Sequence, residues 1–430
     1  MQHSAFLIAF FTTIVRYYDY ALFGLVASIL AETFMPIGNS DQQILAFFGV
    51  FSAAVVVRPV GSIIFGIIGD RFGRAVAVKI GALLAALSTS LIGIMPGFKE
   101  IGLWAPVLLT FCRMLFLASL AGDVDATKVY VAEKIGISNR NLGNGIISSC
   151  SQIGALIAAV SYHVTIVYEN FPELWRINFI IGGVAGLFVM LMRHYFQESE
   201  EFLLYKASKK TKPALDLGFF EIIKRNKARF IIAILISGCI GGVYHFLVIF
   251  LGTFSSKVTT ILTTHQAQLM TIKMIAIYAI ISILAGFVAD KVNPLKQIII
   301  TLFLSIFILS LMLFLVKQDI FIIYLAIILI GLAPFYVVPL QIMMQALFTV
   351  EKRMRMYSLS HSIGSIVFSG TTPFLCMLLW QHYKSLSVVF GFLMILLLCL
   401  FISVVFLCIG SAFKVIKPIE KPADIASPLN

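Results

Sequence analysis

Long apolar runs recur along this chain, and no other feature limits its fold as strongly. A helix needs about 20 mostly apolar residues to cross a bilayer. Twelve segments reach roughly that length: residues 6–30, 44–68, 76–95, 102–124, 143–167, 177–195, 230–254, 267–289, 297–316, 320–343, 357–380 and 387–412. Within lipid, backbone polar groups must be satisfied inside the segment, and a helix does this. The sequence therefore predicts an all-α integral membrane protein with about twelve transmembrane helices.

Composition supports the membrane as the solvent of this chain. Only 12% of the 430 residues are charged, whereas soluble domains carry about 25%. The net charge of +12 comes from Lys and Arg that flank the apolar runs, as expected for cytoplasmic loops. We therefore expect the lipid bilayer, and no nucleic acid, as a partner. The first run is longer than the roughly 7–15 apolar residues of a signal peptide, so we expect it to be kept as a span.

One long polar segment divides the chain into two halves with six runs each. This segment, residues 196–229, is rich in Glu, Lys and Arg. A six-plus-six arrangement with a charged central loop is typical of carriers built from a duplicated unit. We predict an N-terminal six-helix bundle at 1–195, a cytoplasmic linker at 196–229, a C-terminal six-helix bundle at 230–412 and a cytoplasmic tail at 413–430.

Lysine and arginine are distributed unequally between alternate loops. The basic set of loops contains Arg71, Arg74, Lys134, Arg140, the residues of the central segment, Lys291, Lys296, Lys352, Arg353, Arg355, Lys414, Lys417 and Lys421. The other set contains Lys99, Arg176, Lys257, Lys317 and Lys384. Because cytoplasmic loops are enriched in Lys and Arg, we expect both termini to be cytoplasmic, in a bacterial inner membrane.

The sharpest local motif follows the second apolar run. It contains Gly66, Asp70, Arg71, Gly73 and Arg74. Glycines allow tight turns and close approach of helices. A similar pattern follows the eighth run, with Gly286, Asp290 and Lys291. Its repetition at the matching place in the second half indicates a duplicated six-helix unit.

This motif resembles the loop signature of the major facilitator superfamily. Residues 48–61, which include Arg58 and Pro59, are similar to the metabolite:proton symporter branch. That branch contains carriers of proline and betaine and of carboxylic acids such as α-ketoglutarate and citrate. Further segments that agree are residues 18–24, 113–133, 175–201 and 353–358. The resemblance implies the major facilitator fold, transport by alternating access and symport with H+, with the two Gly-Asp loops gating the cytoplasmic side.

Charged residues within the first run are candidates for the substrate or proton path. A charge at the centre of a membrane helix costs about 2.5–3.5 kcal/mol, so it normally faces a cavity or a partner. Arg16 and Asp19 are three residues apart and could form a static pair on one helix face. Alternatively, Asp19 lines a central cavity and binds a proton or a cationic group. The family pattern has an acid where Arg16 stands, a departure that bears on proton coupling.

The fourth run adds Arg113, followed by Asp123, Asp125 and Lys128. The resemblance implies that Arg113 acts near the proton or substrate path, with Asp123 as its acid. Asp125 and Lys128 have the i,i+3 spacing of a helix pair. A fixed structural ion network is the alternative. The family pattern also differs here at Phe116 and Leu117, where it has a polar and a small residue.

Other residues in the runs complete the candidate path. Tyr18, Tyr20 and Tyr244 are cavity candidates because the first and seventh runs hold equivalent places in the two halves. Lys273, in the eighth run, either holds an anionic group in the cavity or extends outward to the membrane surface. Arg58 and Pro59 favour a structural role, with proline bending the helix.

The motifs of enzymes and ATP-driven pumps do not occur in this sequence. It has no Gly-x-Ser-x-Gly elbow, no Walker loop and no His-Glu-x-x-His, and its six cysteines lack metal-type spacing.

We expect a monomer that is no enzyme, needs no cofactor or metal, and draws energy from a gradient. The predicted function is secondary active transport of a small polar metabolite, either a proline- or betaine-like zwitterion or a carboxylic acid, by proton symport. An uncoupled facilitator and a transporter-like sensor are the alternatives.

Overall fold

The described residues of the computed structural model form helices and short connections. They are residues 2–36, 38–72, 74–121, 127–128, 131, 135, 137–168, 173–192, 227–314, 319–348 and 350–409. We refer to residues 2–192 as the N-terminal half and to residues 227–409 as the C-terminal half. The predicted all-α membrane fold is confirmed.

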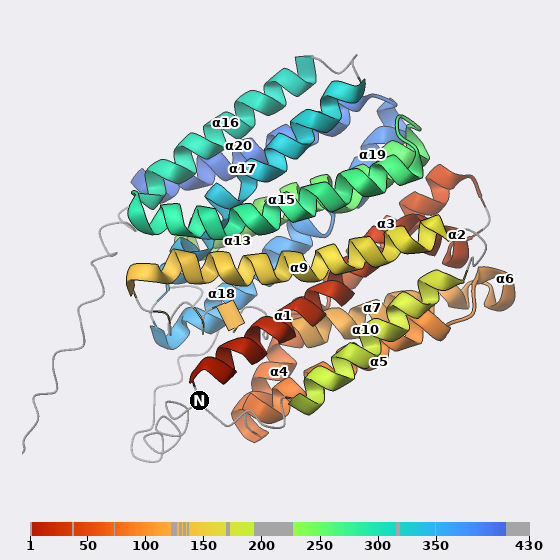
Figure 1. The fold of residues 1–430 in the computed structure, drawn as a ribbon, viewed down its shortest axis with the longest axis horizontal. Coiled ribbons are helices and arrows are strands. Elements are labelled where there is room, and N and C mark those ends of the chain that lie inside the picture. The colour runs from red at the N-terminus through yellow and green to blue at the C-terminus, as the bar shows by residue number, and fades with distance from the viewer. Residues whose placement is uncertain are drawn as a thin grey trace, which may run out of the picture.

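The N-terminal half contains six long helical segments, two of which are interrupted (Figure 1). Its helices are α1 (Gln2–Leu25), α2 (Ala27–Phe34), α3 (Ser40–Val55), α4 (Arg58–Phe72), α5 (Arg74–Ile94), α6 (Phe98–Ile101), α7 (Trp104–Leu120), η1 (Ile137–Asn139), α9 (Arg140–Val167) and α10 (Leu174–Met192). Helices α1 and α2 form one span bent by 61°. The break between α3 and α4 falls directly before Arg58 and Pro59, so that the proline lies in the first turn of α4, where its missing N–H costs little.

The C-terminal half also contains six segments, and two of them include π-helical turns. Its elements are α13 (Lys227–Tyr244), η3 (His245–Phe250), α14 (Leu251–Thr253), η4 (Phe254–Val258), α15 (Thr264–Lys291), α16 (Pro294–Phe314), α17 (Asp319–Ala346), α18 (Val350–Gly364), η5 (Ser365–Ser369), α19 (Thr372–Tyr383) and α20 (Leu386–Ile409). Elements η3, η4 and η5 are π-helices. Such turns occur often at functional sites.

These segments agree with the twelve predicted spans to within a few residues at most ends. In the described part of the chain, nine helices are long and apolar enough to cross a membrane, the α1–α2 pair makes another, and α5 and α7 are shorter apolar helices. Helix α13 starts at Lys227, so the last residues of the predicted linker are helical. The rest of that linker and the predicted tail at 413–430 lie outside the described residues.

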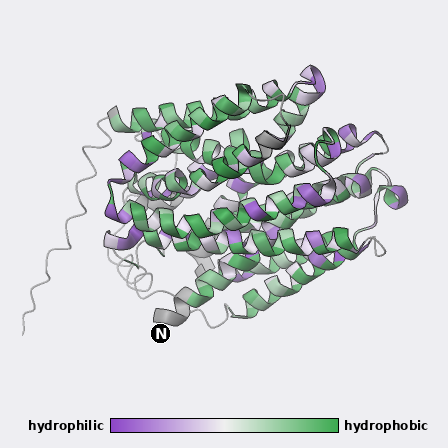
Figure 2. Cartoon of the chain, turned by 45° about the horizontal axis from the view of Figure 1, so that its top comes forward, coloured by the Kyte–Doolittle hydropathy of each residue, from purple (hydrophilic) through white to green (hydrophobic). Residues whose placement is uncertain are grey.

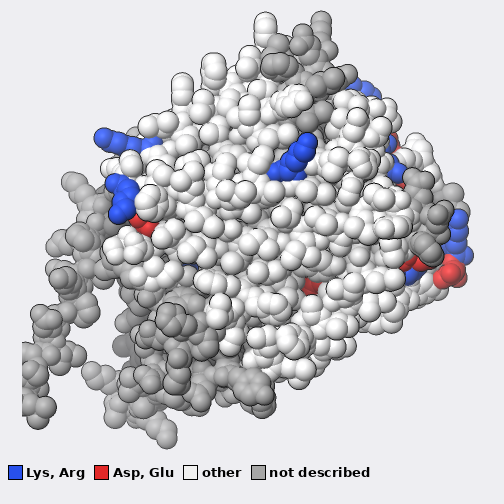
Figure 3. Space-filling view, viewed as in Figure 1, with Lys and Arg blue, Asp and Glu red and all other residues white. Residues whose placement is uncertain are grey.

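Polar residues collect at the two ends of the helices. Figure 2 shows apolar residues along most of each helix and hydrophilic residues near the ends. On the face in Figure 3, most Lys, Arg, Asp and Glu also lie near its two ends. We call these the Lys291 end, where α1 and α9 begin and α15 terminates (Figure 1), and the Lys384 end, where α19 terminates.

The two halves meet along several helix pairs. The closest is the antiparallel pair α9 and α15, and α3 also packs on α19, α4 on α18 and α1 on η3. A Cβ on Gly145 would collide with the backbone of Ser282, and one on Gly286 with the backbone of Asn141. The two glycines therefore allow α9 and α15 to approach at the Lys291 end, as small residues do in membrane helix pairs.

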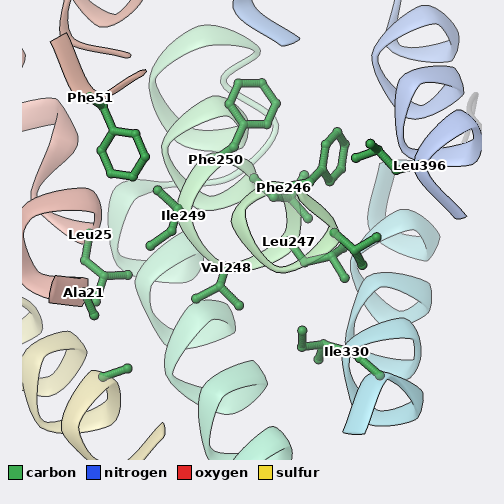
Figure 4. Packing of buried hydrophobic residues seen from close by; sticks show 14 of the residues in the cluster. Ala21, Leu25, Phe51, Phe246, Leu247, Val248, Ile249, Phe250, Ile330 and Leu396 are labelled. Atoms are coloured by element: carbon green, nitrogen blue, oxygen red, sulfur yellow. The ribbon is translucent and has the colours of Figure 1, made fainter. Parts of the chain in front are cut away.

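Element η3 lies at the centre of the shared apolar core. Figure 4 shows Ile249 directed toward Ala21 and Leu25 of α1, while Phe246 lies on the side nearer Leu396 of α20. Ile249 also contacts Gly24, where a side chain would have no room. One turn of the seventh span thus packs against both halves and brings its first residue, His245, to their boundary.

Candidate functional site

Asp19 is buried inside the N-terminal half of the molecule. Its exposed fraction is 4%. Its Oδ1 lies directly against Gly182 of α10, so that any side chain at position 182 would collide with this oxygen. Oδ1 has no hydrogen-bond partner in the described part of the chain. Arg113 and Arg16 are the cations whose charges act on this carboxyl group, and Arg16 is also buried. A buried carboxylate between two cations can bind a proton or a cationic group.

The guanidinium of Arg113 is enclosed by aromatic rings. Its Cζ lies 4.4 Å from the ring centre of Phe23, 4.9 Å from Phe116, 5.3 Å from Tyr20 and 5.8 Å from Phe51. These distances lie within the range of cation–π attraction. Its Nη2 donates to the carbonyl of Tyr20 at 3.0 Å, whereas Nε has no partner among the described residues. We call Tyr20, Phe23, Phe51 and Phe116 the Arg113 cage.

Tyr20 connects this cage to the C-terminal half. Its hydroxyl lies 3.0 Å from Nε2 of His245. Nδ1 of the same imidazole lies 2.6 Å from the carbonyl oxygen of Ser369 and 2.8 Å from its hydroxyl. A chain of polar contacts thus runs from α7 through α1 to η3 and η5.

A second polar contact joins the halves in the same layer. Nη1 of Arg58, at the start of α4, donates to Oγ of Ser365 at 2.8 Å. Tyr244 also crosses the boundary, since its hydroxyl donates to Oε1 of Gln152 on α9 at 3.0 Å. All four side chains are at most partly exposed. The boundary therefore holds a polar layer within an otherwise apolar core.

Two predicted path residues lie away from this layer. The hydroxyl of Tyr18 donates to the carbonyl of Asn178 at 3.0 Å, which places it between α1 and α10 in the N-terminal half. Lys273 is exposed on the face of α15 that also exposes Ile280 and Leu284. Exposed apolar side chains beside Lys273 are those expected on a face directed toward lipid, which favours the outward extension of Lys273 over a place in the cavity.

Of the three charged residues that follow Arg113 in the candidate path, the structure describes only Lys128. Lys128 is buried, with an exposed fraction of 6%. Asp123 and Asp125 lie outside the described residues. Their predicted pairing with Arg113 and Lys128 stays a prediction.

Asp290 links the halves at the Lys291 end. Its Oδ1 accepts from the backbone N–H of Asn141 at 3.1 Å and from Nδ2 of Asn141 at 2.9 Å, and its Oδ2 accepts from the N–H of Leu142 at 2.8 Å. The two backbone N–H groups are orphan donors in the first turn of α9, and a carboxylate there also interacts favourably with the helix dipole. Lys291 lies 5.8 Å from the ring centre of Phe287.

The matching loop of the N-terminal half joins α4 and α5. Backbone helix continues through Gly66, Asp70 and Arg71 in α4 and resumes at Arg74 in α5. Gly73 lies outside the described residues. The gating role of this loop therefore stays a prediction from the sequence.

Two ion pairs join the halves at the opposite end. Nζ of Lys384 lies 3.2 Å from Oδ2 of Asp41, and Nζ of Lys257 lies 3.5 Å from Oε1 of Glu32. Each pair consists of one residue from the N-terminal half and one from the C-terminal half. The boundary is thus bridged at both ends of the molecule.

Sequence reasoning missed His245, Ser365 and Ser369 as site residues. One signal was available: His245 is a polar residue inside a long apolar run and follows the candidate Tyr244. The serines had no such signal, because hydroxyl side chains in membrane helices commonly bond to their own backbone.

Comparisons with known proteins agree with this architecture. The family model described as Major Facilitator Superfamily matches residues 9–264. The chain is 28% identical over 369 residues to the "Putative proline/betaine transporter" of Staphylococcus aureus (strain COL), covering 84% of this chain and 78% of that protein. It is 32% identical over 195 residues to the proline/betaine transporter of Escherichia coli (strain K12), which covers 44% of this chain and 38% of that protein.

Solved structures show the same fold at low sequence identity. The crystal structure of a D-xylose-proton symporter superposes with a TM-score of 0.72 at 16% identity, covering 94% of this chain and 96% of the other. The Escherichia coli fucose:proton symporter gives 0.65 at 14% identity, covering 92% and 98%. Because its described residues form twelve helical segments and a family model matches more than half of its length, the chain belongs to the major facilitator superfamily of membrane transporters.

Proposed function

We propose that this transporter carries a small zwitterion of the proline or betaine type together with a proton. The observation that carries the proposal is the Arg113 cage, which reaches the boundary of the halves through Tyr20 and whose cation acts on the buried carboxyl group of Asp19. The names of the relatives in Staphylococcus aureus and Escherichia coli support the same class of solute. A carboxylic acid such as α-ketoglutarate is the second candidate, since it would also bind Arg113.

The chemistry of the cage suits both ends of a betaine. The guanidinium can bind a carboxylate through two parallel hydrogen bonds, and its Nε is available. Aromatic faces attract quaternary ammonium groups, each worth about 0.5–2 kcal/mol. When a carboxylate draws Arg113 out of the cage, the rings of Phe23 and Phe116 become free for the ammonium group, and Asp19 adds negative charge nearby.

Transport requires that the boundary open on one side at a time. Here Asp290 closes it at the Lys291 end, and the pairs Lys384–Asp41 and Lys257–Glu32 close it at the Lys384 end. Contacts between the halves at both ends fit a carrier that is closed on both sides. We infer that residues 1–195 and 230–412 act as two bundles that rock about the polar layer, with the loop of Asp70, Arg71 and Arg74 as a second cytoplasmic gate.

The sidedness follows from the basic residues. The Lys291 end carries the larger share of Lys and Arg, which supports a cytoplasmic location of that end and of both termini. We place the carrier in the bacterial inner membrane, as a monomer. Alternating access within one chain needs no second copy, because both bundles belong to the same polypeptide.

Uptake into proteoliposomes tests the proposal. The purified full chain is supplied with labelled glycine betaine, proline or α-ketoglutarate, with and without an inward proton gradient. We expect the gradient to stimulate glycine betaine or proline uptake, and Arg113→Gln to abolish it. If the gradient drives uptake of α-ketoglutarate alone, the proposed substrate changes from a zwitterion to a carboxylic acid. Uptake that ignores the gradient would make the protein an uncoupled facilitator, and binding without uptake or counterflow would make it a sensor.

A further inference from the structure

His245 is the one imidazole in the described polar layer and is held from both halves. It is 3% exposed and begins the π-helical element η3. Its contacts to Ser369 stay within the C-terminal half, whereas its contact to Tyr20 crosses to α1. Of these hydrogen bonds, only the one to Tyr20 is therefore broken or made when the halves move relative to each other.

The contacts determine where the ring carries its proton. A carbonyl oxygen can only accept, and the carbonyl of Ser369 lies 2.6 Å from Nδ1. Nδ1 is therefore the donor, and in the neutral ring Nε2 has a lone pair. The hydroxyl of Tyr20, 3.0 Å away, donates to that lone pair. The closed boundary thus fits a neutral imidazole.

A second proton reverses this hydrogen bond. It occupies the Nε2 lone pair, so that Nε2–H donates to the phenol oxygen of Tyr20, and the O–H of Tyr20 rotates away from its former acceptor. The charged groups that act on the ring are Arg58 on α4 and Arg113 on α7, both cations, and Phe51 on α3 presents only a ring edge.

We propose that His245 is the proton-binding site of the transport cycle and that its charge, placed beside Arg58 and Arg113 while the halves are closed, couples protonation to their movement. This inference rests on the proposed proton symport and assigns its site. The step is the addition of H+ to Nε2, which replaces the O–H···N hydrogen bond from Tyr20 by an N–H···O hydrogen bond to it. Proton release restores the O–H···N bond.

The same geometry explains why a proton would not leak through alone. A protonated His245 beside two arginines opposes closure of the boundary, so that a carrier loaded only with a proton stays open. A solute carboxylate bound to Arg113 adds a negative charge to the layer and offsets the imidazolium. The empty carrier and the fully loaded carrier can then close, which is the condition for symport.

Transport assays of the His245→Gln variant test proton coupling separately from movement of the solute. Proteoliposomes are assayed with labelled glycine betaine for counterflow at equal pH and for accumulation under an inward gradient of one pH unit. One proton per solute permits up to about tenfold accumulation under this gradient. We expect accumulation by wild type and by the control His382→Gln, which changes an exposed histidine at the Lys384 end. His245→Gln should equilibrate the solute without accumulating it and retain slower counterflow. About tenfold accumulation by His245→Gln would overturn the proposal.

A measurement without solute keeps this test separate from the choice of substrate. Nitrogen-15 NMR of histidine-labelled wild-type protein in liposomes, compared with His245→Gln, reports the two nitrogens of His245. We expect the Nδ1–H form at high pH and a doubly protonated ring at lower pH, with the transition moved by Tyr20→Phe. A ring that stays neutral from pH 5 to 8 would overturn the assignment even if transport is proton-driven. If no tested solute moves but the ring titrates as expected, the proposed substrate fails and the proton site stands.

Discussion

Nη1 of Arg58 and Oγ of Ser365 form a 2.8 Å hydrogen bond that joins the start of α4 to the first residue of η5. The two residues are 307 positions apart in the chain. Both are buried, and a buried donor left without a partner costs about 1–3 kcal/mol. The bond therefore favours the closed boundary over states in which the halves separate.

Ser365→Ala should shift the population away from the closed conformation. A loss of about 1.4 kcal/mol would change the ratio of closed to open states tenfold. Distances between spin labels at the exposed positions Gln42 and Tyr383, on a background without native cysteines, should become longer and broader. Ser310→Ala is a suitable control, since the Ser310 hydroxyl bonds only within α16. An unchanged distance distribution would show that this bond does not hold the halves together.

Asp290→Asn should loosen the Lys291 end alone. The change removes the negative charge at the start of α9 and replaces one acceptor oxygen by a donor. Loss of a helix cap costs about 0.5–2 kcal/mol, so we expect uptake to fall several-fold. Alkylation of a cysteine introduced at the buried Asn144 should become faster from the side of the Lys291 end.

Asp41→Asn is the matched comparison for this gate. Asp41 pairs with Lys384 at the opposite end, so its substitution should leave alkylation at position 144 slow. Equal alkylation rates in the two variants would show that Asp290 does not close its own end.

Gly182→Ala should disable the site without destroying the fold. A methyl group at 182 collides with Oδ1 of Asp19, so the carboxyl group must move. We expect uptake to fall at least about tenfold, equivalent to about 1.4 kcal/mol, while the protein still purifies as a folded carrier. Gly391→Ala is the control, because a Cβ there meets no atom within 4 Å. It should keep uptake and gain up to about 1 kcal/mol of helix stability. Normal uptake by Gly182→Ala would separate Asp19 from transport.

Lys273→Gln should leave transport almost unchanged. The side chain is exposed on the face of α15 that we expect to be directed toward lipid, where a long cationic side chain reaches toward the membrane surface. We expect the Michaelis constant for the solute to change less than about twofold, equivalent to about 0.4 kcal/mol. A tenfold rise would return Lys273 to the substrate path.

The fold was predictable because length and hydropathy dominate in a membrane. For example, the run predicted at 143–167 is α9 in the structure, and its ends follow from where the apolar residues stop and the loop charges begin. The duplicated motif also pointed to Asp290, whose carboxylate caps α9 in the opposite half. The identity of that partner was not predictable, because no sequence pattern marks the N–H groups of Asn141 and Leu142.

The site was harder to predict than the spans. These helices carry apolar residues on every face. The periodicity of the sequence therefore cannot distinguish residues at the boundary of the halves from residues that face lipid. Tyr20, Tyr244 and Arg113 were candidates from residue type and resemblance, and their role in transport stays a prediction. His245 is the first residue of η3 and Ser369 is the last residue of η5, and the sequence carries no rule for such π-helical turns.

The π-helical turns change the directions in which side chains point along the seventh span. An α-helix advances about 100° per residue, and a π turn accommodates one residue more than an α turn. The helix after η3 is therefore out of phase with the helix before it. Deleting Val248 would remove the extra residue of η3 and rotate Thr253 and Phe254 by about 100° relative to His245. The extra residue therefore has to be kept if the side chains before and after η3 are to keep their present directions relative to each other.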